Sequence, residues 1–126
     1  MMRDLNKTII NALESVKGFD IITLDVSGLT DVMDAIVVVS GNTNRQVKAL
    51  ASVVVEDCKK AGFTPLGVEG AEVGEWVLVD LGDIVVHVML PETRVFYDLE
   101  KLWSMGPKDV AAHEAGTGAN LDLAGE

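Results

Sequence analysis

The sequence predicts a compact, three-layer-like α/β domain with a mixed sheet. Two observations predict this fold class. Segments with apolar residues at helical spacing alternate along the chain with short segments rich in β-branched residues. One of the latter, residues 35–39, is apolar at every position, which is typical of a strand covered on both faces. At 126 residues, the chain suits a single domain with one well-buried core.

The first expected elements are a helix over residues 4–17, which Gly18 stops, and a strand over residues 21–26. The apolar face of the helix consists of Leu5, Ile9, Ala12, Leu13 and Val16. In the strand, apolar Ile22, Leu24 and Val26 alternate with Ile21, Thr23 and Asp25. A turn at residues 27–31 then leads into the apolar strand over residues 35–39.

The apolar strand ends at Ser40-Gly41-Asn42, where a second helix is expected to begin. Asn42 or Thr43 would cap this helix by accepting a backbone N–H. Its apolar stripe consists of Val47, Leu50, Ala51, Val54 and Cys58. A short strand over residues 66–69 follows. If it runs parallel to the apolar strand, the three elements form a right-handed crossover.

A hairpin is the next expected feature, with Leu81-Gly82 as a two-residue turn. This register places Asp80 opposite Asp83, Leu78 opposite Val85 and Trp76 opposite His87. One face is apolar throughout and is expected beneath the helices: Val77, Val79, Ile84, Val86, Val88 and Leu90. The other face mixes Trp76, Leu78, Val85 and Met89 with Asp80, Asp83 and His87. This half-polar face suits either a wet interface or the edge of an ordinary core.

Pro91 begins a last helix that is expected to extend to residue 103. At 3.6 residues per turn, its apolar stripe consists of Val95, Phe96, Leu99, Leu102 and Trp103. Tyr97 falls on the opposite, polar side. An aromatic residue on a polar face is typical of side chains that anchor partners, although single exposed aromatic residues without a role are also common.

The pattern ends near residue 105, so the chain divides into a domain over residues 1–105 and a tail over residues 106–126. The tail is rich in small residues and is expected to be poorly ordered, with at most one helical turn around residues 110–115.

No apolar run is long enough to cross a bilayer, and no signal-peptide pattern is present at the start. We therefore expect a cytoplasmic protein without a membrane partner.

The composition of the chain limits the kinds of molecule that it is expected to bind. The net charge of −10, from 20 acidic and 10 basic residues, disfavours extensive contact with nucleic acid, because phosphate binding requires basic groups. A basic protein partner fits this charge, as does a simple role in solubility. Cys58 is the single cysteine and falls on a helical apolar stripe, so we expect it to be buried and unreactive.

Catalysis is not indicated by any complete set of residues. Ser40-Gly41-Asn42 joins a strand to a helix start, as in phosphate sites, but neither GxGxxG nor a Walker lysine is present. Asp80 and Asp83 flank a turn, a spacing that suits turn hydrogen bonds better than a two-metal clamp. His87 has no Ser or Cys nucleophile in its hairpin and is expected to pack or to hydrogen-bond. We expect no catalytic residue, no metal and no cofactor.

Three segments occur in a specific order: LDVSGLTDVMDAIVVVSGNTNRQVKALA, then VEG, then GEWVLVDLGDIVVHVMLPETRVFYDLEKLW. Together they closely resemble the iojap-related family of bacterial ribosomal silencing factors, over about residues 5–103. The resemblance implies a nucleotidyltransferase-like topology without the active site, and a binding protein that is not an enzyme. It implies a translational repressor that docks on the large ribosomal subunit through its protein fourteen. Bound there, it would block joining of the small subunit when nutrients are short.

Residue by residue, the resemblance implies partner contacts at Trp76, Leu78, Arg94, Tyr97, Asp98 and Glu100. The aromatic residues would supply desolvated area, and the acidic residues would meet basic groups of the ribosomal protein. The resemblance also implies a homodimer when the protein is free, and the sequence does not divide Trp76 between the two interfaces. The alternative function is a nucleotide-binding or nucleotidyltransferase-like enzyme that uses Ser40-Gly41-Asn42.

Overall fold

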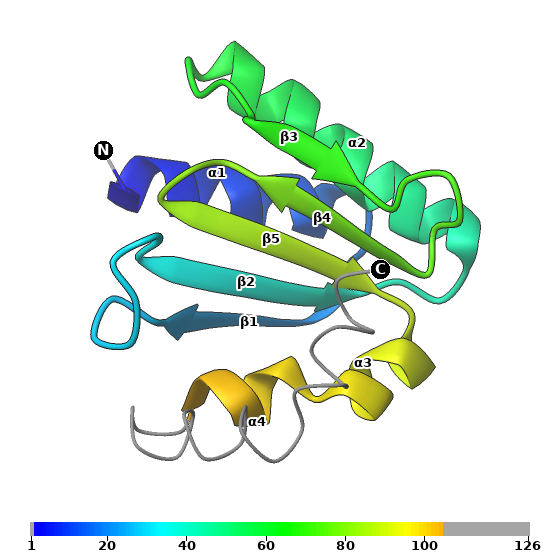
Figure 1. Cartoon of the computed structure of the whole chain (residues 1–126). Coiled ribbons are helices and arrows are strands. Elements are labelled where there is room, and N and C mark those ends of the chain that lie inside the picture. Colours follow the sequence, from blue (N-terminus) through cyan, green and yellow to red (C-terminus); the bar gives the residue numbers. More distant parts are fainter. Residues whose placement is uncertain (1, 105–126) are drawn as a thin grey trace.

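The computed structural model describes residues 2–104 and contains a five-stranded mixed sheet (Figure 1). In chain order the elements are α1 (Met2–Ser15), β1 (Phe19–Asp25), β2 (Ala35–Ser40), α2 (Asn44–Lys60), β3 (Gly67–Glu69), β4 (Trp76–Asp80), β5 (Ile84–Met89), α3 (Pro91–Tyr97) and α4 (Leu99–Ser104). The predicted tail, residues 106–126, lies outside the described residues.

The strands lie in the order β1-β2-β5-β4-β3. β2 and β5 are parallel, and the other neighbouring strands are antiparallel, which confirms the predicted mixed sheet. β3 runs in the same direction as β2, but β5 and β4 lie between them, so the second helix crosses over two strands. Figure 1 shows α1 and α2 together on one side of the sheet, with α3 and α4 along the β1 side.

β2 is buried at every position, as its apolar sequence predicts. Ala35, Val37 and Val39 belong to the larger core cluster, which joins the sheet to α1 and α2. Ile36 and Val38 belong to a smaller cluster on the other face, which includes Leu99 of α4. Because consecutive strand side chains point to opposite faces, only a strand covered on both sides is apolar throughout.

The predicted bounds of the first helix hold to within two residues, and the second helix begins at one of its two predicted caps. α1 ends at Ser15, and Lys17 (φ 63°) adopts the left-handed conformation in place of Gly18. Gly18 is needed because a Cβ there would lie 2.7 Å from Val39 Cγ2. Thr43, one of the two predicted caps, accepts the backbone N–H of Gln46 at 3.0 Å and begins α2.

The hairpin pairs in a register that differs from the predicted one by two residues. Leu81 N–H donates to Ile84 O at 3.0 Å, so the turn residues are Gly82-Asp83 rather than Leu81-Gly82. Consequently Trp76 lies opposite Met89, Leu78 opposite His87 and Asp80 opposite Val85. Gly82 has a φ of 87°, a conformation that glycine adopts readily at the first turn position and Leu81 would not. A two-residue shift keeps every side chain on its predicted face.

The last helix is broken, contrary to the prediction of one continuous helix. Asp98 (φ 51°, ψ 51°) separates α3 from α4, and its N–H donates to Arg94 O at 2.9 Å. Val95 and Phe96, predicted to be buried, are 79% and 77% exposed, whereas Leu99 is buried as expected. Tyr97 is half-buried, so its predicted place on the outer side is wrong. The side chains of Leu102 and Trp103 lie outside the described residues.

Candidate functional site

The face of β4 and β5 opposite α1 and α2 is only partly covered. Trp76, Leu78, Asp80 and Val85 are half-buried there, and we call these four residues the open sheet face. The opposite side of the same hairpin is buried beneath the helices, as predicted, through Val77, Val79, Ile84, Val86 and Val88, with Leu90 partly buried against it. The hairpin therefore has one core face and one face available for contact.

Trp76 is fixed on the open sheet face by contacts at two sides of its indole ring. Its Nε1–H donates to His87 Nδ1 at 2.9 Å, a diagonal contact between β4 and β5. Its ring also packs against Tyr97 of α3, with 4.7 Å between ring centroids at 46°. Sequence patterns placed Trp76 and His87 on one face and predicted a packing or hydrogen-bonding role for the histidine, which is confirmed. The helical pattern, however, placed Tyr97 on the outer side of its helix and not against the Trp76 ring.

His87 is almost fully buried and lies beside Val38 and Leu78 in the sheet. Burial in these surroundings lowers the pKa of His87 to about 4, because the charged imidazolium loses its hydration. A neutral imidazole that accepts at Nδ1 carries its proton on Nε2. His87 thus serves as a hydrogen-bond acceptor for the indole and is poorly suited to acid–base catalysis near neutral pH.

Tyr97 connects the sheet to the exposed side of α3. Its ring packs edge-on against Phe96, with 5.0 Å between centroids at 88°. Trp76, Tyr97 and Phe96 therefore form one continuous series of rings, which we call the aromatic row. Phe96 is the exposed end of this row, whereas the continuous helix predicted from the sequence would have buried it.

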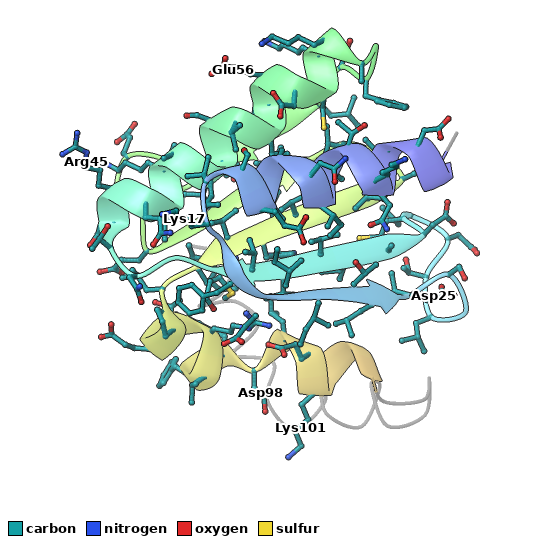
Figure 2. All side chains as sticks on the ribbon, turned by 180° about the vertical axis from the view of Figure 1, so that it is seen from behind. Lys17, Asp25, Arg45, Glu56, Asp98 and Lys101 are labelled. Carbon is teal, nitrogen blue, oxygen red and sulfur yellow. The ribbon has the colours of Figure 1, made fainter. Side chains whose placement is uncertain are left out.

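The acidic residues of the predicted site have different surroundings. Asp98 is exposed at the junction of α3 and α4, and Figure 2 shows its carboxylate directed away from the sheet. Glu100 is half-buried, and its Oε1 accepts from Arg94 Nε at 2.7 Å. Of the two carboxylates, Asp98 is the one presented outward.

Arg94 is not on the surface, contrary to what the family resemblance implied. It is 8% exposed, and its Nη1 donates to Ser40 Oγ at 2.9 Å in addition to the ion pair with Glu100. The guanidinium is therefore directed into the fold. Arg94 is therefore not one of the half-exposed side chains of the open sheet face.

The segment Ser40-Gly41-Asn42 is occupied by contacts within the fold. Arg94 donates to the Ser40 hydroxyl, and Asn42 N–H donates to Gln46 Oε1 at 2.6 Å. A Cβ on Gly41 would lie within 3.2 Å of both Val47 and Leu50. These contacts favour a turn and helix cap over a phosphate site.

Asp80 and Cys58, two further residues that the sequence singled out, have structural roles. Asp80 Oδ1 accepts Gly82 N–H at 2.9 Å, the turn role predicted for it. Within residues 2–104, no group of three or more His, Cys, Asp or Glu side chains could hold a metal ion. Cys58 is buried as predicted, and burial, with the nearby Asp57 carboxylate, raises the pKa of its thiol to about 11. No helix in the described part is long and apolar enough to cross a membrane.

Known proteins resemble this chain in both sequence and structure. A family model described as "Ribosomal silencing factor during starvation" matches residues 1–122. The ribosomal silencing factor RsfS of Chromobacterium violaceum is 54% identical over 102 residues, which cover 81% of this chain and 84% of that protein. A crystal structure of a protein from Chromobacterium violaceum superposes with a TM-score of 0.81 at 53% identity, over 82% of this chain and 87% of that chain.

A more distant relative comes from mouse. The protein called "Mitochondrial assembly of ribosomal large subunit protein 1" is 34% identical over 100 residues. The matched region covers 77% of this chain and 44% of the mouse protein. The similarity therefore corresponds to less than half of that longer protein.

Proposed function

The chain belongs to the family of ribosomal silencing factors that act during starvation, a family of translational regulators, and we propose how this member acts. It binds the large ribosomal subunit through the subunit's protein fourteen, at the surface that the small subunit would otherwise occupy. Bound there, it sterically blocks subunit joining and lowers translation when nutrients are short. Neither catalysis nor a cofactor is part of this action.

The aromatic row is the observation that carries this proposal. Large aromatic residues that are held rigid lose little conformational entropy on binding, and they dominate the energy of many protein interfaces. Trp76 is fixed by His87 and by Tyr97, and Leu78 adds apolar area beside it. The open sheet face and the aromatic row thus provide a preorganised apolar centre for a docking surface.

Charge supports a basic protein as the partner. Asp98 follows Tyr97 of the aromatic row in sequence, its carboxylate is directed away from the sheet, and the whole chain carries a net charge of −10. A polar rim around an apolar centre is the usual arrangement of a docking surface. Asp98 would meet a basic side chain of the ribosomal protein, and the partly exposed Glu100 would add to the negative potential.

The names of the relatives support the large subunit as the target. The curated bacterial relative is called a ribosomal silencing factor, and the mouse relative is named for assembly of the ribosomal large subunit. We propose that the free protein is cytoplasmic and forms a homodimer. Sedimentation equilibrium across a concentration series measures this association, and a constant monomer mass at all concentrations would contradict the dimer.

Cosedimentation with isolated ribosomal subunits tests the proposed docking. The protein is expected to pellet with the large subunit and not with the small subunit, and to prevent joining of the two on a density gradient. Trp76→Ala and Tyr97→Ala are each expected to weaken binding about tenfold or more, as interface aromatic residues do. Equal binding to both subunits would contradict the proposal.

The variants need a matched control because Trp76 and Tyr97 also pack against the smaller core cluster. Val32→Ala removes a side chain that is 84% exposed, in the loop at the opposite end of the β1–β2 pair from Ser40. It is expected to bind like the wild type. Thermal unfolding of each variant shows whether a loss of binding exceeds the loss of folded protein.

A further inference from the structure

Arg94 joins three elements that are distant in sequence. It lies on α3, its Nη1 donates to Ser40 at the end of β2, and its Nε forms an ion pair with Glu100 in the first turn of α4. The hydrogen bonds measure 2.9 Å and 2.7 Å, and the Arg94 side chain is 9% exposed. Both partners are therefore fixed relative to one planar guanidinium group.

α3 depends on such anchors for its position. It has only seven residues, and Leu90 at its N-cap provides no side-chain hydrogen bond. Helices this short are marginal on their own, so their placement comes from tertiary contacts. Arg94 O also accepts the N–H of Asp98, which fixes the left-handed residue that ends α3. One residue thus anchors the helix to the sheet and defines the point where the chain changes direction.

Two of the proposed contact residues, Tyr97 and Asp98, come shortly after Arg94 in the chain. Tyr97 lies between Arg94 and Asp98 in sequence, and its ring meets Trp76 at 4.7 Å. We propose that Arg94 is a positioning residue, which touches no partner but fixes the α3–α4 junction so that Tyr97 and Asp98 face the docking surface. This inference rests on the docking function proposed above.

The energetics of buried ion pairs agree with a role in geometry. Removing charges from water offsets most of the attraction between them, so this pair of a buried Arg94 and a half-buried Glu100 contributes little net stability. Its hydrogen bonds nevertheless specify one arrangement of the groups involved. The Arg94 contacts therefore determine where α3 lies more than how stable the domain is.

A double-mutant cycle tests the proposal with the full chain and isolated large subunits. Arg94→Met is expected to weaken binding about tenfold, because the aromatic row loses its fixed geometry. In the Tyr97→Ala background, the same substitution is expected to weaken binding by only about threefold, since the effect through Tyr97 is already lost and only the effect through Asp98 remains. Equal losses in both backgrounds would overturn the proposal.

Arg45→Met is the matched control because it removes the same charge from an exposed position in the first turn of α2, which Figure 2 shows pointing outward. It is expected to bind with wild-type affinity. Arg94→Lys keeps the charge but not the planar fork, so it is expected to restore only part of the loss. Wild-type affinity in a folded Arg94→Met protein would also overturn the proposal.

The indole N–H signal of Trp76 in a proton–nitrogen NMR spectrum gives a second readout. The signal is assigned by its absence in Trp76→Phe. It is expected to shift in Arg94→Met and to stay unchanged in Arg45→Met, because Tyr97 packs on the indole ring. An unchanged Trp76 signal in Arg94→Met would overturn the positioning role.

Two further outcomes are distinguishable. If Arg94→Met does not fold, Ser40→Ala removes only one of the two hydrogen bonds and is expected to weaken binding about threefold, and by less in the Tyr97→Ala background. If the wild type binds neither subunit, the proposed function fails. The NMR comparison then still reports whether Arg94 positions the aromatic row.

Discussion

At the scale of single residues, the bond between Trp76 and His87 depends on protonation. The indole N–H donates to His87 Nδ1 at 2.9 Å, and a protonated imidazole has no acceptor at that atom. Because burial lowers the pKa of His87 to about 4, the bond persists throughout the neutral range. Protonation would have to break this bond and place a charge in the core.

The pH dependence of stability follows from the same residue. The pKa of His87 is about 4 in the folded protein and about 6.5 in the unfolded chain. The folded state therefore binds fewer protons, so stability is complete above pH 6.5 and falls as the pH decreases toward 4, by roughly 3 kcal/mol. Urea unfolding of the wild type and of His87→Gln measures this effect, and parallel pH profiles for the two proteins would contradict it.

Asp98 has two separable properties, its left-handed backbone and its charge. Asp98→Asn removes the charge but keeps a side chain that tolerates this backbone, so stability is expected to change by less than about 0.5 kcal/mol. Asp98→Ala is expected to lose about 1 kcal/mol because alanine is strained there. Both variants are expected to bind the large subunit more weakly and with less salt dependence. Thermal unfolding and titrations at low and high salt separate the two properties.

At the scale of elements, the loop between β3 and β4 sets the start of the strand that carries Trp76. Gly70 has a φ of 85°, and a Cβ there would lie 2.1 Å from Trp76 O. The backbone of the loop therefore passes directly against β4. Gly70 is the last residue of the segment VEG, so this segment brings the loop into contact with the start of β4.

Gly70→Ala is expected to destabilise the domain by several kcal/mol, on the order of 3 or more, because both the backbone angle and the missing space oppose it. Gly62→Ala is the matched control, since Gly62 has a φ of 93° but open space around it. Gly62→Ala is expected to lose only about 1 kcal/mol from backbone strain. Denaturant unfolding compares the two, and similar losses would show that space near Trp76 is unimportant.

At the scale of the whole molecule, the net charge of −10 affects how fast a basic partner is found. Long-range attraction raises the association rate and is screened by salt, while the dissociation rate depends on the buried contacts. Raising the salt concentration is therefore expected to lower the association rate with the large subunit by about tenfold or more and to change the dissociation rate little. Stopped-flow kinetics measures both rates, and a salt-independent association rate would contradict this role of the charge.

Elements with a strong local signal could be predicted from the sequence. The apolar run of β2, the stripe of α2 and the alternating faces of the hairpin follow from the periods of strands and helices, and they are observed as predicted. The family was also recognisable, because motifs in a fixed order are sequence features. Face assignment survived the register error because the hairpin shifted by two residues.

The path of the chain after β5 depends on tertiary contacts that a local pattern does not contain. Nothing in the local sequence excludes a continuous helix through Asp98, which would place Val95 and Leu99 on the same side. The break at Asp98 instead lets Leu99 enter the smaller core cluster while Val95 stays exposed. The contacts that select this arrangement join Arg94 to Ser40, 54 residues away, and Tyr97 to Trp76. A local pattern does not contain such distant partners, so the site was assembled only by folding.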